Sequence, residues 1–265
     1  MYPAARRSSF RGRQSEITAG GGNATHSPPC PGLRLHMEQG VNAMSISLEV
    51  WGEYALFSRP EMKVERVSYD VMTPSAARGL VEALFWHPGL RWIIDRIHVC
   101  APIRFTNLRR NEVKSTISAR AAHTAMERNR GELYLCTSED IQQRAALLLR
   151  DVRYVIEAHF ELVPERAAPG DNAGKFQDIV TRRIRRGQCY HQPYFGCREF
   201  PARFRWCDEI PPCPEELKGQ TRDLGWMLYD MDYSDPEDVK PLFFRGKLED
   251  GVLRVPARDS GEVRG

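Results

Sequence analysis

The alternation of apolar and polar residues predicts several strands. Apolar side chains occupy every second position of 45–51, which places them on one face of a half-buried strand. The same alternation recurs over 97–105 and over 154–162. The apolar run 145–149 is followed by a polar pair at 150–151, so we expect it to turn there and pair antiparallel with 154–162.

Helical spacing predicts two helices. Thr73 can cap the first helix and Pro74 suits its first turn, and apolar residues then recur at three- and four-residue intervals as far as Phe85. The second helix is expected over 172–186, where apolar residues four positions apart form a buried stripe of Phe176, Val180 and Ile184.

The order of the elements indicates the fold class. A strand, a helix and a strand are followed by a polar excursion over 106–140, two strands, a second helix and short strands after Phe200. This β-α-β…β-α-β order is that of the ferredoxin-like arrangement, which RNA-recognition modules share with many enzymes. We therefore expect an α+β protein with a ferredoxin-like (RRM-like) domain at 44–200, a small β-rich lobe at 201–256 and a frayed tail at 257–265.

Residues 1–43 differ from the rest of the chain. They are rich in Gly, Ser, Pro and Arg and show no hydrophobic periodicity, which is typical of a segment that cannot bury enough apolar surface to order itself. We expect a disordered tail, or a start assigned ahead of a true start at Met37 or Met44. A basic arm that binds nucleic acid is the alternative.

Composition and charge exclude several classes of protein. The formal net charge of +3 comes from residues 1–43, with five arginines and two glutamates, so the 33 basic and 33 acidic residues of 44–265 balance. The longest aliphatic run, about five residues at 145–149, is far below the roughly 20 needed to cross a bilayer. No apolar segment follows the N-terminal arginines, so no secretory signal is expected. Seven scattered cysteines favour reduced thiols in a cytoplasmic protein.

Two local clusters of basic residues fit a nucleic-acid partner. Four arginines lie within 182–186, and Lys175 precedes them on the same predicted helix. Guanidinium groups suit contacts with phosphate, although a solvated helix face is the alternative interpretation. A second cluster lies at the end of the 97–105 strand and in the excursion, and comprises Arg104, Arg109, Arg110, Lys114 and Arg120.

The segment 187–200 combines glycines, aromatic residues and one histidine directly after the arginine-rich helix. Its aromatic rings could stack on bases, and His191, Tyr190 or Tyr194 could transfer protons. A packed turn that satisfies His191 is the alternative.

Metal and cofactor sites are not expected. Cys189, Cys197, Cys207 and Cys213 lie 8, 10 and 6 positions apart, without the close pairs typical of structural zinc sites. The acidic cluster at 232–238 contains a proline and is typical of a turn. The chain has no phosphate loop, GxGxxG after a strand, HExxH or GxSxG motif.

Four segments resemble a known family. The opening WGEYALFSRPEMKVERVSYDVMTPSAARGLVEALFWHPGLRW (51–92), LRRNEV (108–113), GQCYHQPYFGCREF (187–200) and LGWMLYDMDY (224–233) are similar to the CRISPR-associated family-five proteins of the type I-C (Dvulg) subtype. The resemblance runs from about Met44 to Pro256 and implies a ferredoxin-like domain with a small C-terminal β lobe.

The resemblance also implies an activity. Such proteins cut the repeat hairpins of precursor CRISPR RNA, keep the 5′ handle and join the backbone and large subunits of the type I-C Cascade complex. Their reaction is metal-independent: the ribose 2′-OH attacks the adjacent phosphate, leaving a 2′,3′-cyclic phosphate and a 5′-OH. It needs a base, a cation for the phosphorane and an acid. The alternatives are a structural RNA-binding subunit that does not cut, and a zinc-dependent nuclease.

The family's functional positions carry over only in part. The family places a tyrosine before the tryptophan that follows the first helix, and a Lys-His pair at the start of the second helix. Here these positions hold Phe85-Trp86 and Lys175-Phe176. The resemblance thus implies Lys175 as the phosphorane cation, with His191, Tyr190 or Tyr194 left to transfer protons. The expected RNA-binding residues are Trp86, Arg109, Arg110, Arg182, Arg183, Arg185, Arg186 and Arg198.

Overall fold

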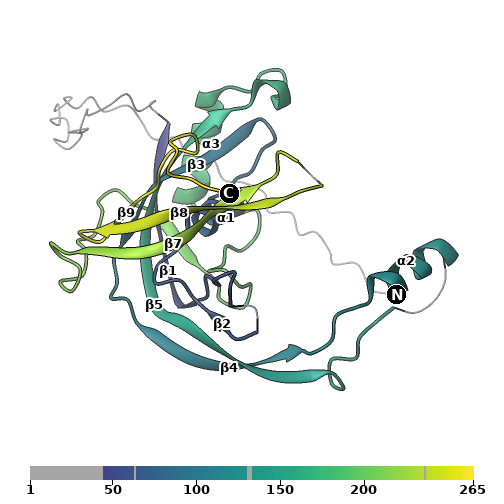
Figure 1. The fold of residues 1–265 in the computed structure, drawn as a ribbon. Coiled ribbons are helices and arrows are strands. Elements are labelled where there is room, and N and C mark those ends of the chain that lie inside the picture. The colour runs from purple at the N-terminus through teal and green to yellow at the C-terminus, as the bar shows by residue number, and fades with distance from the viewer. Residues whose placement is uncertain (1–43, 63, 130–132, 236) are drawn as a thin grey trace, which may run out of the picture. The chain divides into compact units, whose positions relative to one another are not determined.

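The computed structural model describes residues 44–62, 64–129, 133–235 and 237–265, so the expectations for 1–43 lie outside it. This part mixes few helices with one large, mostly antiparallel sheet, in agreement with the expected mixture of α and β structure (Figure 1). The strands are β1 (Ser45–Ala55), β2 (Arg66–Val67), β3 (Leu90–Val99), β4 (Phe105–Val113), β5 (Ile141–Leu162), β6 (Arg203–Trp206), β7 (Thr221–Asp232), β8 (Lys240–Glu249) and β9 (Val252–Arg254). The helices are α1 (Pro74–Leu84), α2 (Ala119–Arg128), α3 (Ala173–Arg185) and the 3-10 turn η1 (Pro164–Arg166). None of these helices is both long and apolar enough to cross a membrane.

Four antiparallel strands form the centre of the sheet. Their order is β6-β1-β5-β3, with α1 between β1 and β3 in the chain and α3 between β5 and β6. Beyond β3 the sheet continues through β9, β8 and β7, and Ile97 of β3 pairs with Leu253 of β9. The C-terminal strands therefore extend the same sheet as the central four.

Both predicted helices are confirmed, with their caps. The Thr73 hydroxyl accepts the Ala76 N–H at the start of α1, and the Asn172 carbonyl oxygen accepts the Lys175 N–H at 2.9 Å at the start of α3. The predicted stripe of α3 is buried in the same hydrophobic core as the apolar face of β1. The core residues of that stripe are Phe176, Val180 and Ile184.

β5 corrects one prediction. The expected turn at 150–151 is wrong, because β5 continues through it as one strand of 22 residues, with Asp151 in the left-handed region at φ 53°. The two halves of β5 have different partners. Leu147 pairs with β2 and β4, whereas Ile156 lies between β1 and β3. Partners remote in sequence thus keep extended a segment whose local residues favour a turn.

The expected strand at 97–105 is also wrong, since β3 ends at Val99 and β4 begins only at Phe105. The excursion at 106–140 contains most of β4 as well as α2. Figure 1 shows β4 and the first half of β5 as an arm with α2 at its end. Most residues of β4 are exposed, so it lacks the hydrophobic alternation that would reveal a strand.

The last residues lie along β8, in contrast to the expected frayed tail at 257–265. Phe243 and Arg264 exchange both backbone hydrogen bonds, at 2.7 and 2.8 Å. Val263 packs against the core, and the Arg264 guanidinium lies 5.5 Å from the ring centre of Trp226.

Candidate functional site

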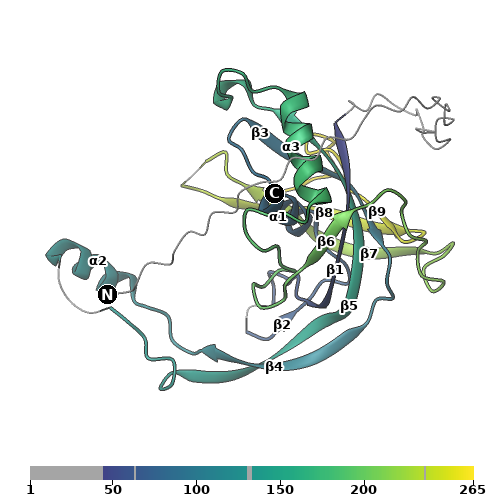
Figure 2. The ribbon, with the colours of Figure 1, turned by 180° about the vertical axis from the view of Figure 1, so that it is seen from behind.

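The segment that leaves α1 lies against α3. The rings of Phe85 and Phe176 are 5.8 Å apart and both are buried, so the two family positions that hold phenylalanine here belong to the core. Between them and solvent, Trp86 is 60% exposed. Arg183 joins the two elements, because its guanidinium donates to the Leu84 carbonyl at 2.8 Å and lies over the Phe85 ring. Figure 2 shows α3 from the side on which it is uncovered.

Lys175 lies in the first turn of α3 and is paired with a buried carboxylate. Its Nζ is 2.8 Å from Oδ1 of Asp171, and the Lys175 side chain is 49% exposed whereas that of Asp171 is 2% exposed. The Ala168 N–H donates to the other oxygen of Asp171 at 2.8 Å. The hydrogen bond from Lys175, together with that from Ala168, holds the pKa of Asp171 below its usual value. The carboxylate is therefore ionised at neutral pH.

His87 faces the same carboxylate, and sequence reasoning missed it. Its Nε2 lies 3.6 Å from Oδ2 of Asp171, and its Nδ1 accepts the Gly89 N–H at 3.1 Å. The ring packs 4.9 Å from that of Phe176, and 30% of the side chain is exposed. The available signal was that His87 directly follows Trp86, but no local pattern places it beside the start of α3.

The segment 187–200 lies at the other end of α3. The backbone N–H groups of Tyr190 and His191 donate to the Ala83 carbonyl at 2.9 and 3.3 Å, at the end of α1. His191 and Tyr194 line a cavity of about 320 Å³, and Tyr190 is largely exposed. In the part of the chain that the structure describes, no side-chain hydrogen bond or ion pair joins Lys175 to these three residues.

The arginines of α3 divide into two groups. Arg182 and Arg186 are exposed, and Arg185 is exposed but pairs with Asp208 at 3.1 Å and lies over Trp206. Arg183 is half-buried and holds the end of α1, as described above. Arg182 and Arg186 are therefore better placed for RNA phosphates than Arg183.

The arginines of β4 lie far from α3. In both views β4 is at the bottom and α3 at the top, so the two predicted basic clusters do not form one patch (Figures 1 and 2). Arg110 is mostly buried, because it pairs with Glu199 at 2.5 Å and with Glu112 at 3.6 Å. Arg109 is exposed on β4, and Arg198 is exposed in the loop before β6.

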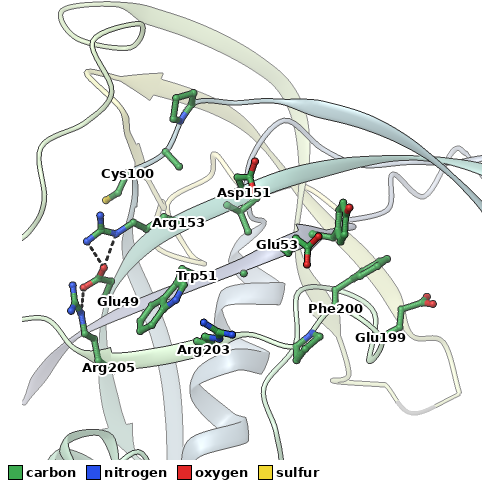
Figure 3. A pocket seen from close by; sticks show the side chains of 16 residues that line it. Glu49, Trp51, Glu53, Cys100, Asp151, Arg153, Glu199, Phe200, Arg203 and Arg205 are labelled. Carbon is green, nitrogen blue, oxygen red and sulfur yellow. Dashed lines mark hydrogen bonds and ion pairs between the residues drawn. The ribbon is translucent and has the colours of Figure 1, made fainter.

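A second cavity, of about 770 Å³, lies over Trp51, beside β1, β5 and β6 (Figure 3). At its edge, the Glu49 carboxylate is 4% exposed and accepts hydrogen bonds from Nε of Arg153 and of Arg205, both at 2.6 Å. The Arg205 guanidinium also lies 5.5 Å from the Trp51 ring centre. Burial raises the pKa of Glu49, but the two arginine hydrogen bonds outweigh it and leave that pKa below its usual value.

The six cysteines of the described chain are free thiols. Burial raises the pKa of the Cys100 thiol to about 11, so it is not a reactive thiolate at neutral pH. Within the described ranges, no group of three or more His, Cys, Asp and Glu side chains is arranged to hold a metal ion.

Comparison with known proteins follows the same sequence range as this fold. Residues 45–256 match the model of a family described as CRISPR-associated protein (Cas_Cas5), of the Cas5d type. The chain is 47% identical over 226 residues to a protein of Mannheimia succiniciproducens named CRISPR pre-crRNA endoribonuclease Cas5d, with 84% of this chain and 99% of that protein covered. A protein of the same name from Thermus thermophilus is 40% identical over 236 residues, which cover 82% of this chain and 94% of that protein.

Solved structures show a similar fold. One, named Crystal Structure of CRISPR-associated Protein, superposes with a TM-score of 0.57 at 21% identity, covering 84% of this chain and 100% of the other. The functionally uncharacterized protein SMU1763c of Streptococcus mutans superposes with a TM-score of 0.59 at 20% identity, covering 83% and 97% of the two chains.

Proposed function

Because the chain belongs to the Cas5d family of CRISPR-associated proteins, we propose that it is an endoribonuclease that cuts the repeats of precursor CRISPR RNA. The observation that carries this proposal is the 47% identity to a pre-crRNA endoribonuclease over 99% of that protein's length. After cleavage the chain keeps the 5′ handle of the product. It then acts as a subunit of the type I-C Cascade complex, beside the backbone and large subunits, in the cytoplasm.

The proposed reaction is an internal transfer at phosphorus. The 2′-OH gives its proton to a base, its oxygen bonds to the adjacent phosphorus, and the bond from phosphorus to the 5′-oxygen breaks as that oxygen takes up a proton. The products are a 2′,3′-cyclic phosphate and a 5′-OH. Lys175 is the candidate cation for the phosphorane, because its exposed Nζ can leave Asp171 for a phosphate oxygen.

The residues proposed for proton transfer are His191, Tyr190 and Tyr194. Their best support is chemical, since imidazole and phenol groups can exchange protons and the buried phenylalanines at 85 and 176 cannot. Their position beside the end of α1, rather than beside Lys175, makes them less favourable than the lysine.

RNA binding is proposed for the surface at and after α3. Trp86 offers an exposed ring on which a base can stack, and Arg182 and Arg186 offer exposed guanidinium groups for phosphates. Arg185 and Arg198 lie at its margin. Arg183 contributes by holding Phe85 and Trp86 in place, and Arg109 and Arg110 would meet a different part of the RNA, along the β4 arm.

The strand order supports a ferredoxin-like core for this activity. The order β6-β1-β5-β3, with α1 and α3 as the two crossovers, is that of a split βαβ sheet. Since β6 pairs with β1, the boundary between this core and a small C-terminal β lobe is better drawn after Trp206 than at 200. β7, β8 and β9 would then form the lobe.

Cleavage of a type I-C repeat hairpin in the presence of EDTA tests the function. A single cut that leaves a cyclic phosphate is expected. A hairpin that stays intact but tightly bound would instead establish a structural RNA-binding subunit, an alternative favoured by the two phenylalanines at the family's proton-transfer positions. Cutting that stops with chelator and returns with zinc would indicate a zinc-dependent nuclease.

A further inference from the structure

We propose that His87 is a second phosphate-binding group of the active site, which donates a hydrogen bond from Nε2 to the scissile phosphate beside Lys175. The proposal rests on the proposed cleavage activity and adds a residue to it. His87 lies outside the segments from which proton-transfer residues were predicted, and it reaches the start of α3 only in the folded chain.

The tautomer of His87 is assigned by its neighbours. Gly89 N–H donates to Nδ1 at 3.1 Å, so in the neutral ring Nδ1 is the acceptor and the proton is on Nε2. The Nε2–H then faces the Asp171 carboxylate, whose nearer oxygen is 3.6 Å away. In this state the imidazole is a donor and not a base, which suits it to stabilise negative charge on a phosphate oxygen.

Asp171 shows which kind of ligand the site attracts. Its carboxylate is an anion that already faces the Lys175 ammonium and the His87 Nε2–H, and it accepts the Ala168 N–H as well. A phosphate has the same charge sign and the same need for converging donors. Asp171 is thus a positioning residue, which keeps the lysine and the histidine directed toward a common point.

The exposure of the three side chains allows a phosphate to reach the two donors. Asp171 is 2% exposed, whereas Lys175 is 49% and His87 is 30% exposed. Contact with the buried Phe176 ring fixes the imidazole plane. An RNA whose base stacks on the adjacent Trp86 would bring its backbone to the exposed edges of both donors.

Single-turnover cleavage of the repeat hairpin tests this role. We expect His87→Ala to slow cleavage by about 10²–10³-fold, the usual effect of losing one oxyanion donor. We expect the Kd for a 2′-deoxy hairpin that cannot be cut to change by less than about threefold, as for a donor that acts on the transition state. His87→Gln keeps an amide N–H near the place of Nε2 and should recover most of the rate.

His98 provides a matched control, because its Nε2 lies 3.2 Å from a Glu157 oxygen, far along β3 from α3. His98→Gln should cleave at the wild-type rate. Thermal unfolding of each variant separates a lost donor from a lost fold. A folded His87→Ala protein that cuts at the wild-type rate would overturn the proposal while leaving the proposed function intact.

A measurement independent of cleavage completes the test. In ¹⁵N-labelled protein, the signal that His87→Gln removes identifies the His87 imidazole. Addition of the 2′-deoxy hairpin should shift its Nε2–H resonance, even in a protein that only binds RNA. No shift at saturating hairpin would rule out the contact.

Discussion

Nζ of Lys175 lies 2.8 Å from Oδ1 of Asp171, the residue just before the cap of α3. The carboxylate is buried beneath the ammonium, so the lysine is directed outward from the first turn of the helix rather than along its surface. The pair places a cation with a defined direction next to the exposed Trp86 and the half-buried His87.

Removal of the lysine should separate catalysis from binding. We expect Lys175→Ala to lower the single-turnover rate by at least about 10²-fold, because the phosphorane loses its cation. The Kd for the 2′-deoxy hairpin should rise less than about tenfold. Lys247→Ala is the control, since Lys247 is an equally exposed, ion-paired lysine on β8. Wild-type rates in Lys175→Ala would eliminate the assignment.

Removal of two arginines of α3 should change the salt dependence of RNA binding. We expect Arg182→Ala with Arg186→Ala to weaken binding and to reduce the slope of log K against log[salt] by about 1.4–1.8, at about 0.7–0.9 per phosphate contact. Fluorescence titrations from 50 to 300 mM salt measure it. The matched double variant Arg245→Ala with Arg258→Ala removes two exposed, ion-paired arginines elsewhere. Equal slopes in both proteins would show α3 to be only a solvated face.

Phe176 should matter for stability rather than for chemistry. Its ring is buried among Phe85, His87 and Phe160, so Phe176→Ala should lower the free energy of unfolding by about 3–5 kcal/mol in urea titrations. Phe105→Ala, at a partly exposed ring on β4, should cost less than about 1 kcal/mol. A cost below that at Phe176 would contradict its place in the core.

Glu49 should make stability depend on acidic pH. Because its pKa is lowered in the folded chain, the folded state favours the ionised carboxylate, and this stabilisation is complete above the usual value of 4.5. It should be lost as the pH falls from 4.5 through the lower folded pKa. Glu49→Gln should cost about 1.5–3 kcal/mol at pH 7, the worth of hydrogen bonds to charged groups.

Urea titrations between pH 3 and 7 check this, and the difference between wild type and Glu49→Gln should shrink at the acidic end. Glu49→Gln is the internal reference, because it cannot titrate at this position. A difference that stays constant over this range would show that the two arginine hydrogen bonds do not depend on the charge of Glu49.

The sequence by itself determined the elements whose cause is local. The caps of α1 and α3 and the buried stripe of α3 follow from hydroxyl, amide and apolar side chains at short spacing, and all are present. The alternation at 45–51 marks β1 for the same reason. The order of motifs was also sufficient to indicate the family.

Only the tertiary structure decided the elements and contacts that depend on distant partners. β5 passes through a local turn signal because β2 and β4 hold one half and β1 and β3 the other, and the polar β4 is a strand only because β5 pairs with it. The same is true of the site. His87 and Lys175 meet at Asp171 because α3 packs across the end of α1, and packing between residues far apart in sequence leaves no periodic signal in either segment.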